Sequence, residues 1–101
     1  MIDINKDLLH NQNSIIHQKV FSQKGSSVIL YAIDDNETIA EHQTRNNEFI
    51  YVLDGQIELI VNNKSTIMSK GSFYLIGANN LHTVNGYNKG KFALIILKNR
   101  I

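Results

Sequence analysis

Short runs of β-branched and aromatic residues, separated by turns rich in Asn and Gly, make up most of this 101-residue chain. Ile (15 residues) and Asn (13 residues) are both abundant, and proline is absent. Branched and aromatic side chains favour pleated strands, whereas Asn and Gly favour turns because both tolerate positive φ. The pattern therefore predicts an all-β chain of short strands.

The clearest strand pattern is SSVILYAI at residues 26–33, in which successive apolar side chains alternate between the two faces. Other strand patterns lie at residues 14–24, 37–44, 48–54, 56–63, 65–69, 72–77, 81–87 and 91–99. The dipeptide Asp54-Gly55 predicts a hairpin between two of these strands, and residues 88–90 predict another turn. About eight to ten short strands at roughly 8–12-residue spacing predict a β-sandwich or barrel.

The length predicts one domain over residues 1–101, with an N-terminal arm (1–13) and a barrel (14–99). The arm is expected to form one helical turn or a lid strand. Ten Lys and Arg against nine Asp and Glu give a net charge of +1, which does not predict nucleic acid as a partner. No apolar run approaches about 18 residues, so no membrane association is expected. The absence of cysteine is typical of a reducing compartment, and we expect a cytoplasmic protein.

Several strand patterns are apolar on both faces, among them residues 26–33, 48–54 and 92–97. A single barrel buries only one face of each strand, and a chain of this size has little else to cover the other. We therefore expect a homodimer that buries the outer strand faces and involves the N-terminal segment.

Two histidines and one carboxylate, His42, Glu48 and His82, each lie near the end of a predicted strand. Two imidazoles and a carboxylate can hold Fe, Mn, Ni or Zn as a divalent ion. The histidines could instead be polar residues lining the mouth of a barrel, and Glu48 could be a solvated residue at the start of a strand. Without a metal, a buried pair of Glu48 and His82 would be a candidate acid/base site. Spacing alone does not say whether the three side chains converge.

The first half of this pattern resembles a motif of the cupin superfamily, which consists of small double-stranded β-helix (jelly-roll) barrels. That motif reads G-x5-H-x-H-x3,4-E-x6-G. The chain has His42, Glu48 and Gly55 at the matching separations. Asn36 stands in place of the opening glycine, and Thr44 stands in place of the second histidine.

The second half resembles the other cupin motif, G-x5-P-x-G-x2-H-x3-N. Gly71 and His82 match its first glycine and its histidine. Gly77, Asn79 and Gly86 replace its proline, second glycine and asparagine. The resemblance covers nearly half of the chain and implies a double-stranded β-helix.

The resemblance also implies roles for individual residues. The usual metal set of the superfamily is three histidines and one glutamate, and a neutral hydroxyl at Thr44 is a poor substitute for the missing imidazole. Thr44, Ile50 and Val84 are expected to face a bound ligand, and Gly55 and Gly71 to serve turns.

Three functions are compatible with these residues. The first is a module that binds a small molecule, and a divalent metal with it, inside the barrel. The second is a metal-dependent enzyme, such as a dioxygenase, isomerase or lyase, that uses His42, Glu48 and His82. The third is a ligand-sensing regulatory domain; the chain has no helix-turn-helix pattern, so no direct DNA contact is expected.

Overall fold

The computed structural model describes residues 1–99; Arg100 and Ile101, which the predicted domain includes, lie outside the described residues. Residues 1–99 form one short helix and seven strands: α1 (Ile4–Asp7), β1 (Ile15–Gln23), β2 (Ser26–Ile33), β3 (Thr38–His42), β4 (Asn47–Val61), β5 (Lys64–Ser69), β6 (Phe73–Ile76) and β7 (His82–Leu97). The predicted all-β class is confirmed. The helix has neither the length nor the apolar character of a membrane span.

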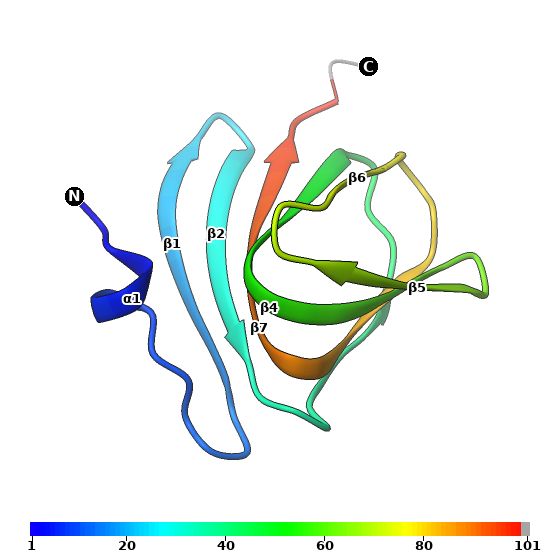
Figure 1. The fold of residues 1–101 in the computed structure, drawn as a ribbon. Coiled ribbons are helices and arrows are strands. Elements are labelled where there is room, and N and C mark those ends of the chain that lie inside the picture. The colour runs from blue at the N-terminus through cyan, green and yellow to red at the C-terminus, as the bar shows by residue number, and fades with distance from the viewer. Residues whose placement is uncertain (100–101) are drawn as a thin grey trace.

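Two long bent strands, β4 and β7, organise the sheet (Figure 1). They pair antiparallel from Asn47–Leu97 at one end to Val61–His82 at the other. The first half of β4 and the second half of β7 form half-sheet I, in the order β1-β2-β7-β4-β6. The other halves form half-sheet II, in the order β3-β7-β4-β5. The chain thus folds one sheet back over itself.

The predicted hairpin at Asp54-Gly55 and the predicted turn at residues 88–90 are wrong. The chain bends at both places without reversing, and the register between β4 and β7 shifts there through a series of bulges. Gly55 has φ of +62°, and a Cβ at this position would overlap the backbone oxygen of Lys89. Gly55 therefore lies at a corner of the sheet, because only a residue without a side chain lets two bent strands approach so closely. Four of the predicted short strands merge into two long ones for this reason. Gly71, with φ of +89°, does lie in a turn, between β5 and β6.

The N-terminal arm forms a helical turn, one of the two predicted alternatives. The Asp3 carboxylate accepts a hydrogen bond from the backbone N–H of Asn5 and caps α1. The buried Lys91 ammonium donates to the Ile4 carbonyl at 2.8 Å, which holds the arm against β7. Leu8 is buried at 1% exposure, so the arm supplies an apolar side chain to this contact.

Asp34, at the end of β2, ties the arm to the corner of the barrel. Its carboxylate accepts hydrogen bonds from the Lys89 ammonium at 2.6 Å and from the Asn13 backbone N–H at 2.7 Å. The bond from Lys89 first, and the bond from Asn13 second, lower the pKa of Asp34 from 3.8 to about 2. The sequence patterns gave no sign of this connection, because its members are far apart in the chain.

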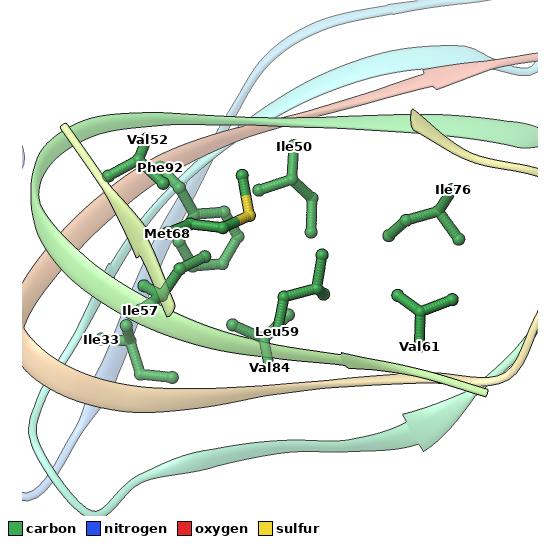
Figure 2. Packing of buried hydrophobic residues seen from close by; sticks show 10 residues of the cluster. All are labelled: Ile33, Ile50, Val52, Ile57, Leu59, Val61, Met68, Ile76, Val84 and Phe92. Atoms are coloured by element: carbon green, nitrogen blue, oxygen red, sulfur yellow. The ribbon is translucent and has the colours of Figure 1, made fainter. Parts of the chain in front are cut away.

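The core lies between the two half-sheets (Figure 2). Side chains from both halves meet there: Ile33, Ile50, Val52, Ile57, Leu59, Val61, Met68, Ile76, Val84 and Phe92. Burial of each such side chain stabilises the fold by roughly 1.5–3 kcal/mol relative to its exposure. Three members of this cluster, Ile50, Val84 and Phe92, also line a small cavity.

The outer faces of the two half-sheets differ. On half-sheet I, exposed apolar side chains come from four strands: Phe21, Tyr51, Phe73, Leu75 and Leu97. On half-sheet II, polar side chains form a hydrogen-bonded row across four strands, the outer ladder: Thr38, Asn85, Glu58 and Ser65.

Candidate metal site

The fold brings together the two histidines and the carboxylate that the sequence placed near strand ends. His42 ends β3 and pairs directly with His82, which begins β7. Glu48 is the second residue of β4. Ligand atoms of the three side chains all lie within 4.8 Å of one another. We call these three residues the inner triad.

Both imidazole rings are oriented by backbone carbonyls two residues earlier. His42 Nδ1 lies 2.9 Å from the Ala40 oxygen, and His82 Nδ1 lies 3.0 Å from the Asn80 oxygen. A carbonyl oxygen only accepts, so each Nδ1 carries the proton. In the neutral ring the lone pair is then on Nε2, which is the arrangement of a histidine that ligates a metal.

Burial leaves the triad with unsatisfied polar atoms. Glu48 is 1% exposed and His82 is 2% exposed. Glu48 Oε2 and His82 Nε2 are buried and have no hydrogen-bond partner within residues 1–99, and Nε2 lies 3.7 Å from Glu48 Oε1. Buried polar groups without a partner are costly and rare in native proteins. A divalent cation coordinated by imidazole nitrogens and a carboxylate oxygen would satisfy them, so the residues fit a metal.

Thr44, at the position of the missing histidine, contacts the triad through Glu48. Its hydroxyl lies 3.0 Å from Glu48 Oε1 and 3.1 Å from the Asn46 carbonyl oxygen, and it accepts a bond from the Asn46 backbone N–H at 3.2 Å. The loop before His82 holds the Thr44 backbone, because the Asn79 N–H donates to the Thr44 carbonyl at 2.6 Å.

A small cavity of about 70 Å³ opens beside the two histidines. Besides them its walls are apolar or aromatic: Tyr31, Ile39, Ile50, Val84, Phe92 and Leu94. Of the three residues predicted to face a ligand, Ile50 and Val84 line this cavity and Thr44 does not. This volume is well below the roughly 300–1,000 Å³ of pockets that bury a drug-sized ligand.

Tyr31 places one polar group in the apolar wall. Its ring stacks on Phe92, with centroids 4.9 Å apart. Burial raises the pKa of the Tyr31 phenol, and the negative charge of Glu48 raises it further. The phenol therefore stays protonated near neutral pH and can donate a hydrogen bond.

Sequence patterns named two of the six wall residues beyond the histidines and missed Tyr31, Ile39, Phe92 and Leu94. Alternation along residues 26–33 does group Tyr31 with Ile29 and Ile33 on one face. It does not say which face is turned inward, because both are apolar.

Comparison with known families agrees with this geometry. The family model described as "Cupin domain" matches residues 29–97, more than half of the chain. The chain belongs to the cupin family. No curated protein matches the cupin chain.

Solved structures with the same fold confirm the double-stranded β-helix. A conserved protein of unknown function from Streptococcus pyogenes superposes with a TM-score of 0.92 at 13% identity, covering 100% of this chain and 89% of that one. A cupin superfamily protein from Desulfitobacterium hafniense gives 0.86 at 14% identity, covering 90% and 84%. A cupin 2 conserved barrel domain protein from Leptotrichia buccalis gives 0.85 at 22% identity, covering 89% of this cupin and 44% of the other chain. At these identities the likeness shows the fold alone.

Proposed function

We propose that this cupin binds one divalent transition metal through His42, Glu48 and His82, and uses the metal to hold a small molecule in the adjoining cavity. The observation that carries the proposal is a pair of buried atoms, Glu48 Oε2 and His82 Nε2, that have no hydrogen-bond partner in the part of the chain that the structure describes. They lie beside a histidine, His42, whose Nδ1 already contacts a backbone carbonyl. Fe, Mn, Ni or Zn suits two imidazoles and a carboxylate, and three protein ligands leave positions for water or a ligand.

The metal proposal is tested by elemental analysis of protein purified without a histidine tag. We expect about one ion per chain in the wild type and none after the double substitution His42→Ala and His82→Ala, because two of three ligands are lost. The chain offers a matched control: His10→Ala with His17→Ala also removes two histidines, and neither belongs to the triad. Equal metal content in the wild type and the triad variant would remove the metal assignment.

The cavity limits the chemical class of the ligand. Its walls are mainly apolar, its volume is about 70 Å³, and its polar groups are the two histidines and the Tyr31 phenol. We therefore propose a small, largely apolar ligand with one oxygen or nitrogen that coordinates the metal. Val84→Phe, which fills the cavity with a larger side chain, is expected to abolish ligand binding and leave metal content unchanged. Undiminished ligand binding in that variant, measured by native mass spectrometry, would move the ligand elsewhere.

A metal-dependent dioxygenase, isomerase or lyase is the second candidate, favoured by the same buried carboxylate. Glu48 touches the metal position, so it could also exchange a proton with a bound substrate. A bound metal would supply a Lewis acid there. Turnover of a candidate substrate only when Fe, Mn or Ni is added would favour the enzyme. A co-purified small molecule that persists without turnover would favour the binding module.

We also propose that two copies of the chain associate through the outer face of half-sheet I. Phe21, Tyr51, Phe73, Leu75 and Leu97 are between 39% and 58% exposed on this face. At roughly 200 Å² for a large side chain, they offer about 400–500 Å², more than half of the roughly 800 Å² that each partner gives to a standard interface. Half-buried apolar neighbours, Phe49 and Ile95 among them, supply more, and such a face is typical of a partner surface.

Light scattering tests the dimer. We expect a dimeric mass at micromolar concentration and a monomeric mass for Phe73→Glu with Leu75→Glu, because two charges would be buried at the contact. Ile67→Glu is the control, since Ile67 is 43% exposed but lies on the outer face of half-sheet II. A monomeric wild type would refute the dimer.

A further inference from the structure

We infer that Thr44 is a positioning residue for the metal ligand Glu48: its hydroxyl donates to Oε1, the carboxylate oxygen 3.7 Å from His82 Nε2, and so fixes the orientation of the carboxylate toward the histidines. The inference deepens the proposed function and rests on it. In cupins the corresponding position usually carries a metal-ligating histidine. The Thr44 side chain is shorter than histidine and a weaker metal ligand. Its hydroxyl instead lies 3.0 Å from Glu48 Oε1.

The direction of the hydroxyl proton follows from the partners of Thr44. The hydroxyl has one proton and two acceptors in reach, Glu48 Oε1 at 3.0 Å and the Asn46 carbonyl at 3.1 Å. It also accepts from the Asn46 N–H, which uses one of its lone pairs. An ionised carboxylate is a stronger acceptor than a carbonyl, and hydrogen bonds to it are about twice as strong. The proton therefore goes to Glu48.

This bond distinguishes the two oxygens of Glu48. Oε1 has the Thr44 hydroxyl, whereas Oε2 is buried without a partner within residues 1–99. Thr44 is itself held at two points. Its backbone carbonyl accepts a hydrogen bond from the Asn79 N–H, and its hydroxyl accepts one from the Asn46 N–H. A held hydroxyl that bonds Oε1 restricts rotation of the carboxylate and keeps Oε1 beside His82 Nε2. Partners of this kind beside metal ligands typically change metal affinity 10–100-fold.

Replacement of the usual histidine by Thr44 also sets how many protein ligands surround the ion. The triad supplies three, and Thr44 supplies none, because a neutral hydroxyl is a poor ligand and this one already accepts from the Asn46 N–H. One more coordination position is therefore open than in a set of three histidines and one glutamate. That position is available to a ligand, and Thr44→His would close it.

Metal titration of the full chain tests the inference, with Co²⁺ as the probe because its visible spectrum reports ligand number and geometry. Thr44→Val keeps the shape but removes the hydroxyl, and we expect about tenfold weaker Co²⁺ binding and an altered spectrum. Thr44→Ser restores a hydroxyl and is expected to restore both. Thr38→Val is the matched control: it removes a β3 hydroxyl that bonds Asn85 on the outer face, and neither readout should change.

Crystal structures of the metal-free wild type and Thr44→Val provide a readout that does not depend on metal binding. We expect the Glu48 carboxylate to turn away from its wild-type orientation in the variant. An unchanged carboxylate, or Co²⁺ affinity and spectrum equal to wild type, would overturn the role of Thr44 while leaving the triad in place. A wild type that takes up no Co²⁺, with the carboxylate still turning in the variant, would instead overturn the proposed metal function.

Discussion

The inner triad and the outer ladder draw on the same strands, β3, β7 and β4, and they differ in how their polar atoms are satisfied. The triad lies on the inner side, with His42 and His82 from half-sheet II and Glu48 from half-sheet I, whereas the ladder lies on the outer face of half-sheet II. In the outer ladder, Asn85 donates to Glu58 Oε1 at 2.9 Å and Ser65 donates to Glu58 Oε2 at 2.6 Å. In the inner triad, the carboxylate of Glu48 has one donor from the described residues 1–99, the Thr44 hydroxyl, and one oxygen without any. The more exposed carboxylate is thus the better satisfied one.

This difference indicates that the Glu58 carboxylate supports the fold and that the Glu48 carboxylate belongs to a functional site. Hydrogen bonds from Ser65 and then Asn85 lower the pKa of Glu58, which means that the folded state favours its charged form. A folded chain that leaves a carboxylate oxygen and an imidazole nitrogen buried without partners accepts a cost in stability. Natural proteins accept such costs mainly at functional sites. The two glutamates, Glu48 and Glu58, allow this contrast to be tested residue against residue.

The largest expected effect concerns metal affinity. Glu48→Gln should weaken binding of the metal at least about 100-fold, because a neutral amide replaces an anionic ligand to the ion. Glu58→Gln should leave it unchanged, because Glu58 faces away from the triad. Competition titration with a chromophoric chelator measures both. Equal losses in the two variants would mean that the contrast between the two glutamates does not exist.

Substitution of Glu48, which weakens metal binding, is expected to stabilise the metal-free protein, and this effect is smaller. Glu48→Leu should raise the free energy of unfolding of the metal-free protein by about 1–2 kcal/mol, because an unsatisfied buried carboxylate is replaced by an apolar group of similar size. Glu58→Leu should lower the urea midpoint, because Asn85 and Ser65 lose their acceptor. Urea denaturation in the presence of a chelator measures both. Destabilisation by Glu48→Leu would show that the triad supports folding as the ladder does.

Acid should lower the stability of the fold by protonating Glu58 and Asp34, whose carboxylates accept hydrogen bonds in the folded state. The pKa of Glu58 is lowered from 4.5 and that of Asp34 from 3.8 to about 2, so both bind protons more readily when unfolded. Their stabilisation is complete above about pH 4.5 and is lost as pH falls toward 2. In Glu58→Gln the urea midpoint should fall less steeply just below pH 4.5, and in Asp34→Asn less steeply between pH 3.8 and 2. Slopes equal to wild type in both variants would contradict this assignment.

The smallest expected effect is on the free energy of unfolding, from substitution of Thr38, the β3 residue at one end of the outer ladder. Thr38→Val removes the hydroxyl that donates to Asn85 Oδ1 at 2.7 Å on the exposed face. Water can replace this bond, so the free energy of unfolding should fall by only about 0.5 kcal/mol. Thermal unfolding at neutral pH measures it. A loss of several kcal/mol would mean that the outer ladder acts as one cooperative network.

Local sequence patterns predicted much of this fold. The bounds of β2 match the predicted strand at residues 26–33, and β1, β5 and β6 lie within one residue of their predictions. The hairpin prediction at Asp54-Gly55 failed because a glycine with positive φ serves a sheet corner as well as a reversal. Only the partner strand decides between the two, and that partner, β7, begins more than 20 residues later.

The candidate site divides in the same way. Motif spacing selected His42, Glu48 and His82, since residue type and separation along the chain are local properties. Motif spacing could not identify the residues that form the walls of the cavity. Phe92 and Leu94 lie in a strand whose two faces are both apolar. Which face points inward depends on the pairing of this strand with β2 and β4.

The amino-acid sequence by itself determined that this chain is all-β and carries two imidazoles and an acid at cupin spacing. Tertiary structure alone decided that Thr44 contacts Glu48 and that Asp34 fastens the arm. It also decided that, among residues 1–99, one oxygen of Glu48 and one nitrogen of His82 lack partners. Strand propensity and motif spacing are set by neighbours in the chain. Satisfaction of a buried polar atom is set by groups that only the folded sheet brings within hydrogen-bond distance.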